Sequence, residues 1–95
     1  MSASDAWAAV LDGRNVLHLA DGLQLRRARV MNDTRVELVG FTEGMRDRLR
    51  AMGLFPEIIS WKLRFFVPVG SAGPEIVARL LERYPLTGVI DRNAA

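Results

Sequence analysis

The chain has 95 residues, of which 49% are hydrophobic and 25% charged, and its 13 basic and 11 acidic residues give a net charge of +2. This length fits a single domain over residues 1–95, and this apolar content supports a core and excludes intrinsic disorder. The absence of cysteine excludes disulfides, thiol redox chemistry and thiolate metal sites.

The first elements expected along the chain are a short helix and a three-stranded antiparallel meander. Ser4 and Asp5 favour a helix that ends at Leu11, before Gly13. Strands are expected over residues 16–20, 23–31 and 34–41, because Asp-Gly and Asn-Asp pairs between them are typical of tight turns.

The alternation of apolar residues in this meander predicts which side is buried. If both turns have two residues, one face carries Val16, His18, Ala20, Leu23, Leu25, Met31, Val36 and Leu38. Arg27 and Arg29 fall on the same face. Either they lie beyond its covered part, or a bulge near Arg26 changes the phase of the strand.

The second half of the chain predicts two helices and two strands. A helix is expected over residues 43–52, a helix beginning at Pro74 and a final strand over 87–91. Between the helices, apolar residues alternate with polar ones from Ile59 to Val67, which predicts one long strand with Trp61, Leu63 and Phe65 buried. The order α-β-β-β-α-β-α-β is typical of the α+β class, with two or three helices on one sheet.

The sequence offers no catalytic residue, no metal ligand set and no cofactor motif, so we expect a protein that is not an enzyme. The single histidine, His18, lies within a strand, where we expect it to pack across from Leu25. No spacing of acids and histidines matches a metal site. The loop over residues 69–74 lacks the lysine of a phosphate-binding loop, which favours an ordinary turn.

Basic residues gather in three of the predicted strands and could contact phosphate groups. The candidates are Arg26, Arg27, Arg29 and Arg35 in the meander and Lys62 and Arg64 in the long strand. Arginine suits phosphate, and a basic sheet face could follow a nucleic-acid backbone. The alternative is a solvated face with internal ion pairs.

Four apolar residues near the ends of elements could form a docking surface for a protein partner. They are Phe41, Leu54, Phe55 and Phe66. The alternative is that they close the core.

Residues 53–69 and 78–86 resemble the small C-terminal segment that follows the motor in bacterial and phage strawberry-notch-type helicase-like proteins. The resemblance implies an accessory domain of a DNA- or RNA-handling polypeptide. Neither a Walker lysine nor an acidic helicase box is present, so ATP hydrolysis is not implied. Residues 36–54 are also similar to the closing strand and helix of STAS-type regulatory domains, although the phosphorylatable serine segment of those domains is missing.

These patterns favour a cytoplasmic, non-enzymatic accessory or docking module of a nucleic-acid-processing protein or assembly, with weak, non-specific contact to the phosphate backbone. The alternative is a regulatory protein–protein interaction module without a nucleic-acid role. The partner expected in both cases is a larger protein or polypeptide, with nucleic acid as the second candidate. No membrane is expected, because the sequence holds neither a secretory signal nor an apolar run of spanning length.

Overall fold

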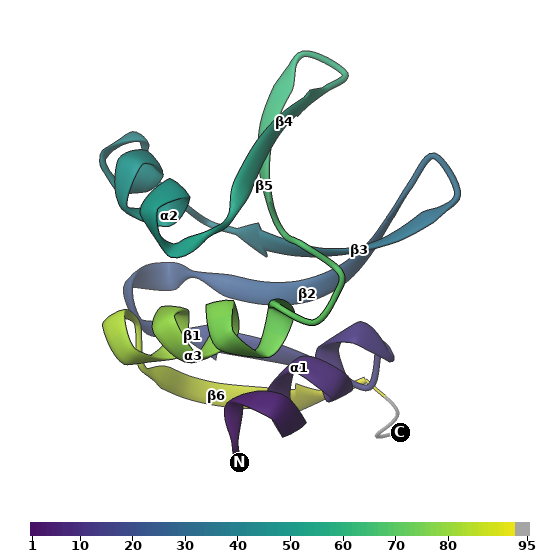
Figure 1. Ribbon diagram of the computed structural model, residues 1–95, viewed down its shortest axis with the longest axis vertical. Coiled ribbons are helices and arrows are strands. Elements are labelled where there is room, and N and C mark those ends of the chain that lie inside the picture. The colour runs from purple at the N-terminus through teal and green to yellow at the C-terminus, as the bar shows by residue number, and fades with distance from the viewer. Residues whose placement is uncertain (93–95) are drawn as a thin grey trace.

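Six strands form one antiparallel sheet in the computed structural model, which describes residues 1–92, and three α-helices pack against it (Figure 1). The strands are β1 (Asn15–Leu19), β2 (Gln24–Val30), β3 (Asp33–Val39), β4 (Phe55–Ile59), β5 (Lys62–Val67) and β6 (Leu86–Asp91). Their order across the sheet is β4-β5-β3-β2-β1-β6. The helices are α1 (Ala3–Leu11), α2 (Arg46–Met52) and α3 (Gly73–Arg83), and the 3₁₀ turns are η1 (Ala20–Gly22) and η2 (Glu43–Met45). The predicted α+β class is confirmed, and so is the order of elements, with the two strands β4 and β5 where one strand was predicted.

The helix ends follow from local chemistry. The Ser2 hydroxyl accepts a hydrogen bond from the Asp5 N–H at 3.1 Å and so caps α1. This cap lies two residues before Ser4, the cap that the sequence favours. Helix α2 ends at Gly53, whose φ of 108° suits a residue without a side chain. Helix α3 carries Pro74 in its first turn and ends before Pro85.

The core lies between one face of the sheet and the helices α1 and α3. Gly73, at the start of α3, lies so close to the ring of Trp7 on α1 that a side chain at this position would meet the indole. The two helices can therefore approach each other closely. The largest fully buried side chains are Tyr84, Phe65, Phe66, Leu17, Leu23, Leu25, Leu38, Leu49, Leu80, Val10, Val36 and Val67.

The prediction of which β1 side chains face the core is wrong. Leu17 and Leu19 are buried in the core, whereas His18 lies across from Gln24 and not from Leu25. The cause is the turn η1, which has three residues where two were predicted, with Asp21 and Gly22 at positive φ. One extra turn residue moves every side chain of a strand to the other face.

The turn between β2 and β3 also lies one residue earlier than predicted. Met31 and Asn32 occupy it with φ of 50° and 71°, so Met31 is 90% exposed and not in the core. Strand β2 pairs with β3 in one unbroken register, without the bulge considered above. Arg27 and Arg29 therefore share the side of Leu25, beyond the part that the helices cover.

The predicted long strand from Ile59 to Val67 is interrupted by a turn, and its second part, β5, belongs to a hairpin with the earlier strand β4. Strands β4 and β5 are joined by Ser60 and Trp61, with φ of 52° and 66°, and pair from Phe55 with Phe66 to Ile59 with Lys62. Phe65 is buried as predicted, and Leu63 is half-buried. Trp61 is 99% exposed, which overturns its predicted burial. The hairpin projects from the rest of the sheet (Figure 1).

Candidate functional site

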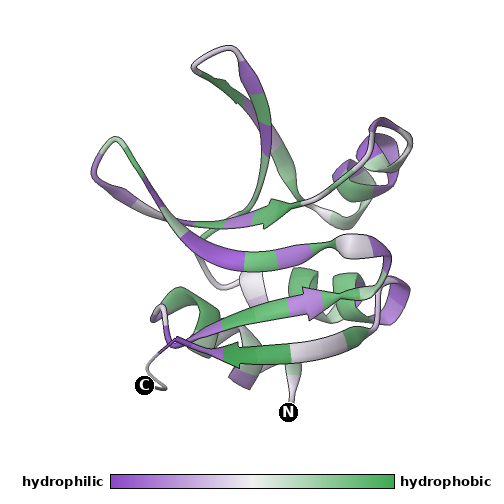
Figure 2. Cartoon of the chain, turned by 180° about the vertical axis from the view of Figure 1, so that it is seen from behind, coloured by the Kyte–Doolittle hydropathy of each residue, from purple (hydrophilic) through white to green (hydrophobic). Residues whose placement is uncertain are grey.

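Among the described residues 1–92, no helix covers the face of the sheet opposite α1 and α3, which Figure 2 shows from the front. The strand register brings side chains from four strands together on this open face. Arg26 on β2 lies across from Glu37 on β3, which lies across from Phe66 on β5, which lies across from Phe55 on β4. Residues far apart in the sequence thus form one row.

Glu37 is the buried charge of this row, with 5% of its surface exposed. Arg64 donates two hydrogen bonds to its carboxylate, from Nε at 2.8 Å and from Nη2 at 2.7 Å. A hydrogen-bonded, bidentate pair of this kind offsets the cost of removing a carboxylate from water. The bond to Glu37 raises the pKa of the Arg64 guanidinium above its ordinary value, so Arg64 is charged at every physiological pH.

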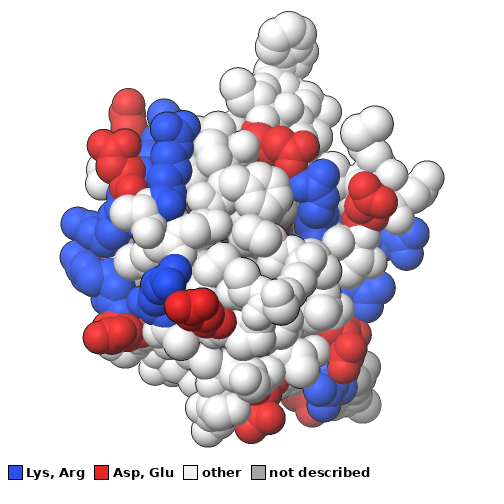
Figure 3. Space-filling model, viewed as in Figure 1, with Lys and Arg blue, Asp and Glu red and all other residues white. Residues whose placement is uncertain are grey.

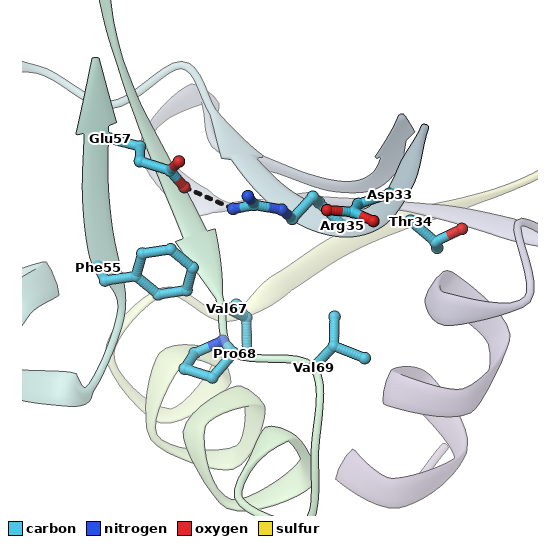
Figure 4. A pocket seen from close by; sticks show the side chains of 8 residues that line it. All are labelled: Asp33, Thr34, Arg35, Phe55, Glu57, Val67, Pro68 and Val69. Carbon is cyan, nitrogen blue, oxygen red and sulfur yellow. Dashed lines mark hydrogen bonds and ion pairs between the residues drawn. The ribbon is translucent and has the colours of Figure 1, made fainter. Parts of the chain in front are cut away.

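Arg35 forms the second ion pair of the open face, with Glu57 on β4 (Figure 4). The guanidinium carbons of Arg35 and Arg64 lie 5.0 Å and 5.4 Å from the ring centroid of Phe66, which is fully buried. Two arginines thus cover an aromatic ring that no helix covers. The hollow beside the pair, of about 530 Å³, is lined by Asp33, Thr34, Arg35, Phe55, Glu57, Val67, Pro68 and Val69 (Figure 4).

A second hollow of the open face holds two cations that have no acidic partner within residues 1–92. It has a volume of about 270 Å³ and is lined by Arg26, Glu37, Val39, Ile59, Ser60, Lys62 and Arg64. Arg26 and Lys62 are exposed and form no ion pair within residues 1–92. Glu37 is the one carboxylate of the lining and is already bound by Arg64. The hollow therefore keeps an excess of positive charge.

The structure separates the six predicted phosphate-contact residues into two groups. Arg26, Arg35, Lys62 and Arg64 lie on the open face. Arg27 and Arg29 lie on the opposite side, where Arg27 donates to the Asp12 carbonyl at 3.1 Å and Arg29 to the Asn32 carbonyl at 3.4 Å. Neighbouring arginines of one strand point to opposite faces, so a dense run of them in the sequence does not form one patch.

The four predicted docking residues mostly complete the interior. Leu54 and Phe66 are buried, so neither offers a contact surface to a partner. Phe41 packs edge-to-face on Phe65 with ring centroids 4.9 Å apart, and Phe55 lies 5.8 Å from Phe66. Both are half-buried.

The exposed apolar surface lies instead at the hairpin β4–β5. Trp61 is 99% exposed and Ile58 72% exposed. Below them, a groove of about 390 Å³ between the hairpin and α2 is lined by Arg50, Pro56, Glu57, Ile58 and Leu63. Basic side chains gather over α2 with acidic ones beside them, and the projecting tip is uncharged on the side seen in Figure 3. Sequence reasoning missed this surface because it placed Trp61 inside a continuous strand.

The other sequence-based candidates are placed as follows. His18 is half-buried on the open face, paired with Gln24 and Gly88. In the loop over residues 69–74, the Gly73 N–H donates to the Gly70 carbonyl at 3.0 Å, as in an ordinary turn. Among residues 1–92, no three His, Asp or Glu side chains are grouped as metal ligands, and no helix has the length and apolarity to cross a membrane.

Comparison with known proteins finds no matching protein family, no matching curated protein and no matching solved structure. The two surfaces of the hairpin region, one apolar and one basic, are therefore the features from which a function can be argued.

Proposed function

We propose that this domain is a non-enzymatic docking module that binds a protein partner through the hairpin β4–β5. The observation that carries the proposal is the full exposure of Trp61 at the tip, next to the largely exposed Ile58. Large exposed apolar side chains that lie together are typical of protein interfaces, and tryptophan is enriched among the residues that contribute most binding energy.

The backbone of the turn supports the same proposal. Ser60 and Trp61 both have positive φ, which a turn of this type requires at both central positions and which glycine and asparagine adopt most easily. A bulky side chain at positive φ costs on the order of 1–3 kcal/mol. Neither folding nor solubility benefits from a tryptophan at this position, so a contact with a partner is the reason we propose for it.

The groove below the tip indicates the chemistry of the partner. Pro56, Ile58 and Leu63 give it an apolar floor, and Arg50 on α2 lies at its rim without an ion pair within the described residues. A partner segment with an apolar anchor and a neighbouring acidic side chain complements this groove in shape and in charge. The sequence resemblance described above supports a partner within a nucleic-acid-processing protein or assembly.

Site-specific photo-crosslinking tests the proposal. A photoreactive residue in place of Trp61 is expected to form a protein adduct in cells of the source organism, and the same residue in place of exposed Glu82 on α3 is not. The adduct must also be lost when Ile58→Asp or Arg50→Glu is added, because both changes alter the groove without touching the core. An adduct that persists in both variants, or the absence of a protein adduct at position 61, would refute the proposal.

A further inference from the structure

The hollow lined by Arg26, Lys62 and Ser60 on the open face lies on the opposite side of the hairpin from the proposed docking groove. We propose that this hollow binds a phosphate group of a nucleic-acid backbone. This inference is independent of the docking proposal, since it uses neither Trp61 nor Ile58.

The charge of the hollow is the first argument. In the two ion pairs of the open face, Arg64 with Glu37 and Arg35 with Glu57, each cation is matched by one acid. Arg26 and Lys62 stand outside these pairs, yet both line the same hollow of about 270 Å³. Two like charges that share a recess repel each other, and a bound anion between them removes that repulsion.

The rigidity of the floor is the second argument. Arg64 holds the Glu37 carboxylate with two hydrogen bonds, so this carboxylate is not available as a partner for Arg26 or Lys62. The donors that remain for a ligand are the Arg26 guanidinium, the Lys62 ammonium and the Ser60 hydroxyl. These groups suit the oxygens of a phosphate, and arginine can bind two of them at once.

The surroundings of the hollow favour a linked backbone over a free phosphate ion. Next to Arg26 along β2 lies Gln24 on the same face, and across from Gln24 lies His18 on β1. Both side chains carry hydrogen-bond donors and extend the polar surface across the sheet from the hollow. An extended chain of phosphates can contact this polar surface as well, whereas a single ion in the hollow is held only by Arg26, Lys62 and Ser60.

The same geometry predicts weak binding without sequence preference. The aromatic ring of this face, Phe66, is covered by Arg35 and Arg64 and is closed to base stacking. Contacts are therefore made to phosphates and not to bases, with a dissociation constant on the order of 10⁻⁴–10⁻⁶ M at physiological salt. With two cations engaged on a single strand, the logarithm of affinity should fall with the logarithm of salt with a slope of about −1.4, about −0.7 for each phosphate.

Fluorescence anisotropy with a labelled oligothymidine at several salt concentrations tests the inference on the full chain. Arg26→Gln and Lys62→Gln should each weaken binding and reduce the slope by about 0.7. The matched controls are Arg27→Gln and Arg29→Gln on the opposite side of the same strand, and Trp61→Ala at the docking tip, all of which should bind as the unmodified protein does. Because these side chains are exposed or, for Arg27, half-buried, and none belongs to the core, circular dichroism should show every variant folded.

Inorganic phosphate and polyglutamate are the competing probes. The expected result is that neither displaces the oligothymidine at equal phosphate or carboxylate concentration. Displacement by inorganic phosphate would show a site for the free ion, and displacement by polyglutamate would show a general anion surface; either result overturns the inference. So does the absence of binding at low salt, or equal losses in the Arg26 and Arg27 variants. As a second measurement, amide chemical shifts on adding oligothymidine should change at Ser60 and Lys62 and not at Arg27.

Discussion

Arg64 on β5 binds both carboxylate oxygens of Glu37 on β3, at 2.7 Å and 2.8 Å, on a sheet face that no helix covers. Together with the Arg35–Glu57 pair, this contact buries Phe66 under two guanidinium groups. Ion pairs thus cover this part of the open side of the sheet.

Removal of one partner of this pair is expected to destabilise the fold strongly. Arg64→Met leaves the buried carboxylate of Glu37 without its donors, which should lower the free energy of unfolding by about 3 kcal/mol in urea denaturation. The double variant Arg64→Met with Glu37→Leu removes both charges and should recover most of this loss. A double variant less stable than Arg64→Met would show that the pair does not act through the unpaired carboxylate.

The pH dependence of this loss follows from the direction of the pKa shift of Arg64. Because Glu37 raises the pKa of the guanidinium, the resulting stabilisation is fully present below the ordinary arginine pKa and is lost only as the pH rises through the raised value. The difference in stability between the unmodified protein and Arg64→Met should therefore show no contribution from Arg64 titration between about pH 6 and 9. Urea titrations at several pH values measure this difference directly.

The alternation of buried and less buried side chains along β1 gives a second prediction. Leu17 is fully buried and Val16 is half-buried on the open face, so Leu17→Ala should cost about 2–5 kcal/mol and Val16→Ala much less. Thermal denaturation of the two variants compares them under the same conditions. Equal losses would mean that β1 does not face the helices as described.

Whether the sequence predicts the buried face of a strand correctly depends on the length of the neighbouring turns. Element order, the helix end at Gly53 and the burial of Phe65 follow from local signals that act within a few residues. The faces of β1 and the tip of β4–β5 do not, because one turn has a residue more than expected and the other carries Ser60 and Trp61 in place of glycine and asparagine. No composition rule identifies such a turn, and because it was missed, Ser60 and Trp61 were included in the predicted strand.

The candidate site, like the fold, was predictable only in part. The cations Arg26, Lys62 and Arg64 are visible in the sequence, but their pairing with acids depends on which strands are neighbours. Strand β5 lies beside β3 and not beside the later β6, so Arg64 reaches Glu37, 27 residues earlier in the chain. The exclusion of Arg27 and Arg29 from the open face, by contrast, follows from the alternation within β2 that already placed them on the side of Leu25.

The contact between α1 and α3 gives a third prediction. A methyl group at Gly73 would meet the Trp7 ring, so Gly73→Ala should cost about 1–3 kcal/mol through overpacking. Gly70→Ala is the matched control, because no atom lies near its added methyl group, and should change stability by less than about 0.5 kcal/mol. The near-ultraviolet circular dichroism of Trp7 should change in the first variant and not in the second.

The last prediction separates the stability of the hairpin from its proposed use. Trp61 is 99% exposed and has a φ of 66°, so its side chain makes little contact while its backbone is strained. Trp61→Gly should therefore raise the free energy of unfolding by about 1 kcal/mol, because glycine adopts positive φ without a steric cost. Trp61→Ala keeps a β-carbon at the strained position and should leave stability nearly unchanged. Urea denaturation followed by the fluorescence of Trp7, the only tryptophan left in both variants, measures the difference. If Trp61→Gly destabilised the protein, the tryptophan would be a structural residue of the hairpin, and its exposure would no longer support a docking role.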